Sequence, residues 1–138
     1  ISLNKRWYLL MENSSSNRQK TVLIIDDEPV ICEMLSRYIG SLGYITHSAN
    51  NCSELLLFLD KEIPDIIFLD IILPEIDGIK ILKLLRRVDP DIQIVMISGI
   101  SSDEIAISAL KLGAFDYISK PLDLNRISEV LRGIEFTS

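Results

Sequence analysis

The stretch VLIIDDEP, Val22–Pro29, decides the fold. Four apolar residues, enough for a short buried strand, run directly into Asp26, Asp27 and Glu28. Adjacent carboxylates repel one another, by roughly 4 kcal/mol for unit charges about 4 Å apart at an effective dielectric constant near 20. Three acids at the end of a buried strand therefore predict a place where a cation binds.

From Thr21 onward the sequence alternates between short apolar runs and amphipathic segments. The expected strands are residues 21–25, 44–49, 65–71, 92–98 and 114–119. The expected helices are residues 28–43, 53–62, 78–88, 101–113 and 123–134. Five strand–helix pairs, with strands that are apolar along nearly their whole length, predict an α/β domain with a doubly wound, five-stranded parallel sheet covered by helices on both faces.

Several residues predict where these helices begin and end. Pro29 suits a first helical turn, and Asp123 suits an N-cap. The spacing of Ser101-x-x-Glu104 is typical of a capping box. Gly43 and Gly113 suit positions just past a helix end.

The 138 residues are enough for one domain, which we place at residues 21–133. Residues 1–20 are interpreted as a flexible leader or a tail foreign to the natural protein. With Met11 as the natural start, Ile1–Leu10 would be foreign residues or come from reading upstream of that start. A short amphipathic element through Trp7–Leu10, packed on a neighbour, is the alternative. Residues 134–138 are expected to form a C-terminal tail or the start of a linker.

The bulk properties argue against several functions. The net charge of −6 argues against direct nucleic-acid binding by this domain, although it leaves room for an attached DNA-binding domain. Apolar runs are all far shorter than the roughly 20 residues of a membrane span, so we expect no membrane association. Cys32 and Cys52 stand alone, as expected for reduced thiols in a cytoplasmic protein.

Polar side chains follow four of the five expected strands. Asp26–Asp27 end the first, Asp70 ends the third, Ser98 ends the fourth and Lys120 follows the fifth. The second strand, which ends near Ser48–Ala49, offers nothing charged. Because ligands of parallel sheets bind beyond the carboxyl ends of the strands, these side chains are expected to share one edge.

That combination suits phosphoryl chemistry. Mg²⁺ prefers oxygen ligands and typically lies between one or two carboxylates and a phosphate. A lysine beside it attracts phosphoryl oxygens as a point charge, and a carboxylate can itself act as nucleophile and form an aspartyl-phosphate. Each residue alone is more often a helix cap, a turn residue or a solvated charge, so the prediction depends on their combination.

These residues resemble the receiver domain of two-component response regulators, the CheY-like family, from residue 21 to residue 133. The resemblance is carried by LIIDDEP (Leu23–Pro29), IIFLDIILPEIDGIKILKLLR (Ile66–Arg86), IVMISG (Ile94–Gly99) and GAFDYISKPLDLNRI (Gly113–Ile127). The second segment contains the family's D-x-x-x-P-x-x-x-G pattern at Asp70, Pro74 and Gly78. The resemblance implies a flavodoxin-like strand order of 2-1-3-4-5.

The resemblance also implies a role for each site residue. Asp70 would be the phosphoacceptor, and Mg²⁺ (or Mn²⁺) would be bound by Asp26, Asp27, Asp70 and the backbone carbonyl of Ile72. Lys120 would contact the phosphoryl oxygens, and the Lys120–Pro121 bond would be cis.

Two further residues would form the switch. Ser98 would be the switch hydroxyl, in place of the commoner Thr, and Tyr117 would be the aromatic that turns inward. Ile72 is apolar where many relatives are polar, which is expected to affect the dephosphorylation rate.

The implied function is that of a signalling domain which catalyses only its own phosphorylation and dephosphorylation. The phosphoryl donor would be a sensor histidine kinase or a phosphotransfer protein. A C-terminal effector domain is an expected partner, as is a second copy bound through the fourth helix, fifth strand and fifth helix.

Three alternatives have different sequence requirements. A haloacid-dehalogenase-type phosphatase needs a D-x-D motif that begins at the nucleophile. In this sequence Ile72 stands two residues after Asp70, where that motif requires its second aspartate. A flavin-binding flavodoxin needs a phosphate loop after the first strand, where DDEP would repel phosphate. A receiver-like interaction module that works without phosphorylation stays open.

Overall fold

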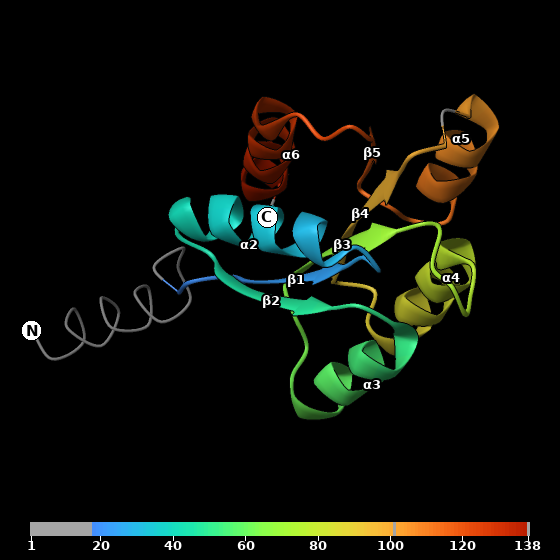
Figure 1. The fold of residues 1–138 in the computed structure, drawn as a ribbon, viewed down its shortest axis with the longest axis horizontal. Helices are drawn as coiled ribbons and strands as arrows, with labels where there is room; N and C mark the ends of the chain where they lie inside the picture. The colour runs from blue at the N-terminus through green and yellow to red at the C-terminus, as the bar shows by residue number, and fades with distance from the viewer. Residues whose placement is uncertain (1–17, 101, 138) are drawn as a thin grey trace, which may run out of the picture.

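A computed structural model of the chain describes residues 18–100 and 102–137, so the interpretations of the leader, of Met11 and of Trp7–Leu10 fall outside the described residues. The five strands are β1 (Thr21–Ile25), β2 (Ile45–Ala49), β3 (Ile66–Asp70), β4 (Gln93–Ser98) and β5 (Asp116–Ser119). They form one parallel sheet in the order β2-β1-β3-β4-β5 (Figure 1). Both the predicted class and the predicted strand order are confirmed.

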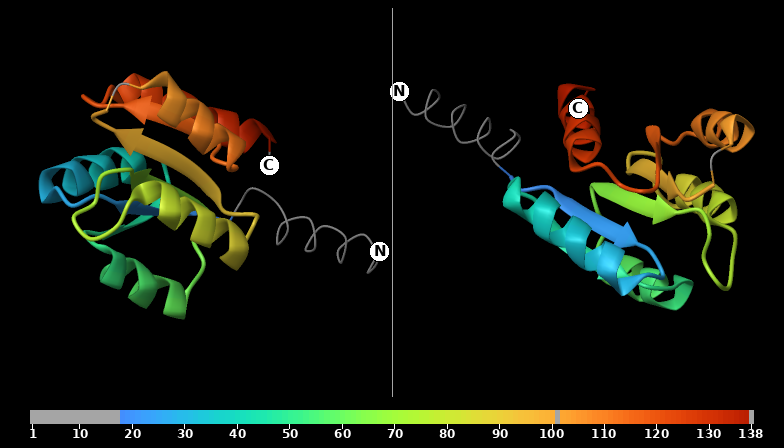
Figure 2. Two further views of the ribbon diagram at one scale, coloured as in Figure 1. Left: turned by 90° about the vertical axis from the view of Figure 1, so that its right-hand side faces the viewer. Right: turned by 45° about the horizontal axis from the view of Figure 1, so that its top comes forward.

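Helices cover both faces of this sheet (Figures 1 and 2). The five helices are α2 (Pro29–Ser41), α3 (Cys52–Lys61), α4 (Gly78–Val88), α5 (Asp103–Lys111) and α6 (Leu124–Thr137). Buried residues of α2 and α6 form one core with the sheet, and those of α3, α4 and α5 form the other.

Alternation along each strand divides the side chains between the two cores. In β1, Leu23 and Ile25 face the core beneath α3, α4 and α5, while Val22 and Ile24 face the core beneath α2 and α6. All four are fully buried. Because both faces are covered, these four consecutive positions are all apolar, and the charged residues follow only beyond the end of the strand.

Most of the predicted helix ends are confirmed. Pro29 occupies the first turn of α2, and the Oδ1 atom of Asp123 accepts a hydrogen bond from the Asn125 N–H at 2.9 Å. Gly43 and Gly113 follow α2 and α5 with φ angles of 101° and 102°, a backbone conformation that favours glycine.

The prediction of a capping box at Ser101 is wrong. The N-cap of α5 is Ser102, whose Oγ accepts from the Ile105 N–H at 3.4 Å. The backbone at Ser102 is extended, with φ −143° and ψ 118°, so the helix begins only at Asp103. The hydroxyl that caps the first turn of α5 is therefore that of Ser102.

The C-terminal helix is longer than expected. It continues to Thr137, whose Oγ1 donates to the carbonyl of Ile134 at 3.1 Å, so residues 134–137 are helical rather than an irregular tail. The division into 1–20, 21–133 and 134–138 stays a prediction. In the described part of the chain, each helix is too short or too polar to cross a lipid bilayer.

Candidate functional site

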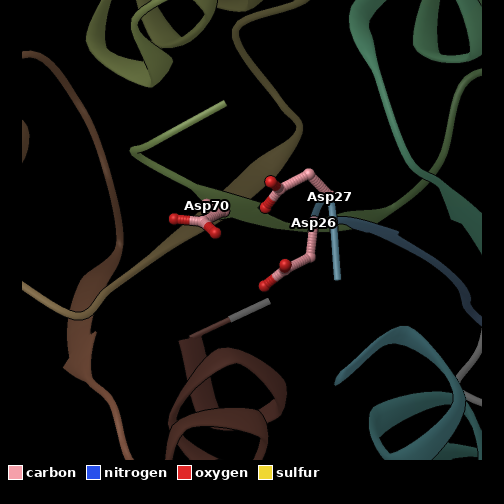
Figure 3. Close-up of side chains that lie close together, drawn as sticks. All are labelled: Asp26, Asp27 and Asp70. Carbon is pink, nitrogen blue, oxygen red and sulfur yellow. The ribbon is translucent and has the colours of Figure 1, made fainter. Parts of the chain in front are cut away.

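Three carboxylates converge at the carboxyl edge of the sheet (Figure 3). Asp26 and Asp27 follow β1, and Asp70 is the last residue of β3. One oxygen from each side chain lies within 4.8 Å of the others. Asp26 and Asp70 are buried, with 0% and 3% exposed, whereas Asp27 is exposed to solvent.

The sheet itself brings these acids together. β1 and β3 are neighbours, so their ends lie side by side. Beyond β1, the Asp26 N–H still donates to the Ala49 carbonyl of β2 at 3.1 Å, which holds this residue in line with the sheet. Asp70 is paired in register with Ile97 of β4. Backbone hydrogen bonding therefore fixes both buried carboxylates.

Lys120 reaches all but one of the nearby acids. Its Nζ lies 2.9 Å from Asp26 Oδ2, 3.1 Å from Asp70 Oδ2 and 3.3 Å from Glu28 Oε1. Burial alone would lower the pKa of Lys120, but its close contacts with the negatively charged Asp26 and Asp70 outweigh it and raise the pKa. The ammonium therefore stays charged, and the bond to Pro121 is cis, as expected.

Asp70 is held at both oxygens. Its Oδ1 accepts from the Ile72 N–H at 3.0 Å, and its Oδ2 contacts Lys120. Burial raises the pKa of Asp70, and the charge of Asp26 adds to this effect, while the Ile72 N–H and Lys120 oppose it. A buried carboxylate with both oxygens oriented has a defined direction in which to react.

The loop after β3 is folded tightly against the strand end. The Gly78 N–H donates to the Ile71 carbonyl at 2.7 Å. A Cβ at Gly78 would lie 2.6 Å from the Asp70 carbonyl oxygen, closer than van der Waals contact allows. The glycine of the D-x-x-x-P-x-x-x-G pattern is therefore required for this close approach of backbone to backbone.

The switch pair predicted from the sequence is linked through one loop residue. Ser98 is fully buried, and its Oγ accepts from the Ile100 N–H at 2.9 Å. The Tyr117 hydroxyl donates to the Ile100 carbonyl at 2.6 Å. The backbone of Ile100 thus contacts both residues, so a movement of Ser98 that shifts this loop also reaches Tyr117.

The structure brings together Asp26, Asp27, Asp70 and Lys120, and it places Ser98 at the same edge of the sheet. The side chain of Ile72 is 52% exposed, and its backbone binds Asp70. Sequence reasoning missed the contact between Glu28 and Lys120, although the DDE run could have indicated it. It also missed the hydrogen bond from Asn50 to the Asp26 carbonyl, because a neutral amide does not form part of a charge pattern.

The donor set fits a hard divalent cation. Four acids lie at this edge and three of them contact the single lysine, so an excess of negative charge stays there. Asp26 Oδ2 is buried and, although it lies near Lys120, accepts no well-oriented hydrogen bond within the described residues. Clustered carboxylate oxygens with incomplete compensation are the ligands that Mg²⁺ prefers.

Comparison with known proteins decides the family. A family model described as "Response regulator receiver domain" matches residues 22–132. The chain belongs to this family. It is a signalling receiver domain of the phosphorylation-activated kind, as the resemblance implied.

Relatives with recorded names agree with this membership. The receiver domain is 39% identical over 112 residues to the regulatory protein AtoC of Escherichia coli (strain K12), covering 80% of this chain and 24% of AtoC. It is 38% identical over 115 residues to the response regulator protein PilR of Pseudomonas aeruginosa, covering 83% of this chain and 26% of PilR. The chain thus spans about a quarter of the length of these relatives.

A solved structure shares both the fold and part of the sequence. This structure, a response regulator protein from Burkholderia pseudomallei with a phosphorylated aspartic acid, calcium ion and citrate, has a TM-score of 0.73 and 29% identity to the receiver domain. The match covers 87% of this chain and 75% of that one.

Proposed function

We propose that this receiver domain accepts a phosphoryl group on Asp70 from the phosphohistidine of a sensor histidine kinase or a phosphotransfer protein. Mg²⁺ (or Mn²⁺) would be held by Asp26, Asp27, Asp70 and the backbone carbonyl of Ile72. The observation that carries the proposal is the setting of Asp70, a buried carboxylate oriented by Ile72 and Lys120 with two further carboxylates beside it.

Phosphoryl transfer requires in-line placement and charge neutralisation. A carboxylate oxygen of Asp70 attacks the phosphorus, and a P–O bond forms as the P–N bond of the donor breaks. The imidazole nitrogen of the donor keeps the electron pair. Lys120, already 3.1 Å from Asp70, offsets charge on the incoming phosphoryl oxygens. When bound, the divalent cation supplies the remaining charge compensation.

The resulting signal is read by Ser98 and Tyr117. The Ser98 hydroxyl accepts from Ile100 in this structure, and a hydroxyl can also donate one hydrogen bond. Donation to a phosphoryl group would pull Ser98 away from Ile100, whose carbonyl binds Tyr117. The surface formed by α5 and β5 is thereby biased between two states.

The partners follow from the same role. The relatives are named regulatory proteins of which a receiver forms about a quarter, which supports a C-terminal effector domain beyond residues 21–133. The exposed Ile107 and Leu110 of α5 support a homodimer through α5, β5 and α6. We place this receiver, with its kinase, in the cytoplasm.

A receiver-like module that works without phosphorylation is the alternative, and one experiment separates the two. The protein is incubated with acetyl phosphate, with and without Mg²⁺, and weighed intact by mass spectrometry. We expect a gain of one phosphoryl group that depends on Mg²⁺ and is lost in Asp70→Asn. Asp60→Asn, an exposed acid on α3, is the matched control and should be phosphorylated like the wild type.

Each result decides between the two functions. Uptake that survives in Asp70→Asn would move the phosphoacceptor elsewhere. If no variant takes up phosphate under any condition, the fold stands and the phosphorylation-independent module becomes the better interpretation.

A further inference from the structure

Asn50 reaches the candidate cation site from the one strand end that carries no charge. It lies immediately after β2, and its Nδ2 donates to the backbone carbonyl of Asp26 at 3.0 Å. The backbone N–H of Asn50 donates in turn to Glu54 Oε1 at 2.8 Å, within the first turn of α3. The backbone of Asn50 is therefore tied to α3 while its side chain reaches the Asp26 carbonyl.

A second donor meets the same carbonyl. Cys32, in the first turn of α2, lies with its Sγ 3.4 Å from the Asp26 carbonyl oxygen, and Asn50 Nδ2 lies 3.5 Å from that sulfur. Both Cys32 and the Asp26 backbone are buried, while Asn50 is half-buried. Side chains from two elements thus converge on one carbonyl, and the amide is the stronger donor.

This carbonyl belongs to the peptide unit that joins Asp26 to Asp27. Because a peptide unit is planar, a hydrogen bond that holds the direction of its carbonyl restricts rotation of the whole plane, and with it the ψ angle of Asp26 and the φ angle of Asp27. Those two Cα atoms carry the carboxylates that converge with Asp70. By holding this carbonyl, the Asn50 amide restrains how the Asp26 and Asp27 carboxylates are oriented relative to each other and to Asp70.

We propose that Asn50 is a positioning residue for the divalent cation, acting through the Asp26 carbonyl. The inference rests on the proposed function, since it assumes that Asp26 and Asp27 bind this cation. Mg²⁺ demands near-ideal octahedral geometry, so its affinity is sensitive to small displacements of its ligands. Outer partners that orient metal ligands typically contribute 10–100-fold to affinity, and we expect about 10-fold here.

Asn51 provides a matched control. It is the same residue type at the next position, and its Oδ1 caps α3 by accepting from the Glu54 N–H at 2.9 Å. Asn51→Ala removes a helix cap and lowers stability without touching the Asp26 carbonyl. Asn50→Ala removes the donor to that carbonyl. A general loss of stability would affect both variants, whereas a loss of positioning affects only Asn50→Ala.

Mg²⁺ affinity is measured by isothermal titration calorimetry on the wild type and both variants, and the Mg²⁺ dependence of phosphorylation by acetyl phosphate is measured alongside. For Asn50→Ala we expect Mg²⁺ to bind about 10-fold more weakly. The half-saturating Mg²⁺ concentration should rise equally, and the rate at saturating Mg²⁺ should stay close to that of the wild type. Asn51→Ala should match the wild type in both Mg²⁺ measurements.

Three other outcomes would overturn the inference. If Asn50→Ala binds Mg²⁺ like the wild type, the amide does not position the ligands. If both variants are weakened equally, the effect is a general one on the β2–α3 region. If the wild type itself binds no Mg²⁺, the proposed cation site fails, and the role of Asn50 fails with it.

Discussion

Both edges of the sheet carry ion pairs, but those at the carboxyl edge are buried and the pair between Arg18 and Asp65 at the amino edge is largely exposed. At the carboxyl edge, Lys120 is only 16% exposed in its side chain and faces the buried carboxylates of Asp26 and Asp70. At the amino edge, Arg18 pairs with Asp65 at 2.7 Å, and the arginine side chain is 63% exposed. One edge has an excess of buried acid, and the other has matched charges near solvent.

The difference shows that only the carboxyl edge depends on a cation to compensate buried charge. Exposed pairs are worth about 0–1 kcal/mol and leave nothing uncompensated when broken. Buried charges carry a large desolvation penalty that is offset only when each has a partner. The carboxyl edge is therefore stable to the extent that Lys120, or a bound cation, compensates its acids.

The largest effect should come from removing the lysine. Lys120→Met leaves Asp26 and Asp70 buried without their cation, so the free energy of unfolding should fall by about 3–5 kcal/mol. Arg18→Met, at the other edge, should lower it by only about 0–1 kcal/mol. Urea unfolding without divalent cations measures both. Equal losses in the two variants would show that the edges do not differ as described.

The clustering of charged side chains at the carboxyl edge could be predicted from the sequence. Because the carboxyl ends of parallel strands meet at one edge, the acids after β1, the acid that ends β3 and the lysine after β5 are expected to converge. The Ile100 backbone bridge and the Asn50 amide could not be predicted, because neutral donors form no charge pattern and their partners depend on loop conformation. The misplaced cap at Ser101 has the same origin, since the sequence does not distinguish which of two adjacent serines adopts the N-cap conformation.

The two edges should also differ in how an added methyl group affects phosphorylation. At Gly78, beside Asp70, a Cβ would press on backbone atoms at 2.6 Å, so Gly78→Ala should lower the free energy of unfolding by about 1–3 kcal/mol, as overpacking does. It should also slow phosphorylation, because relief of the clash moves the backbone of Asp70. Phosphorylation rates and urea unfolding measure the two effects.

Two glycines serve as controls for this variant. Gly43, near the amino edge, has open space around its Cβ position but a φ of 101°, so Gly43→Ala should cost about 1–2 kcal/mol and leave phosphorylation unchanged. Gly99, in the loop after β4, has open space too, and Gly99→Ala should change stability little. A Gly78→Ala variant that is phosphorylated at the wild-type rate would contradict the close fit at Asp70.

The smallest effect concerns Tyr44 at the amino edge. Burial, together with the hydrogen bond to Glu135 at 3.1 Å and the charge of that residue, raises the pKa of Tyr44 to about 12. The pKa of an unfolded tyrosine is about 10. The folded protein therefore holds this proton more tightly than the unfolded chain does, so the contribution of Tyr44 to stability is complete below about pH 10 and is lost as the pH rises through about 12.

Ultraviolet absorbance of tyrosinate, recorded for the wild type and for Tyr44→Phe, isolates this titration by difference. Glu135→Gln should lower the pKa of Tyr44 only in part, because burial, the largest cause, remains. A difference curve centred near pH 10 would mean that Tyr44 is solvated like an unfolded residue and that the amino edge is looser than its contacts indicate. A curve centred near pH 12 would mean that Tyr44 is buried and bonded to Glu135 as the structure describes, so that the amino edge keeps these contacts at neutral pH.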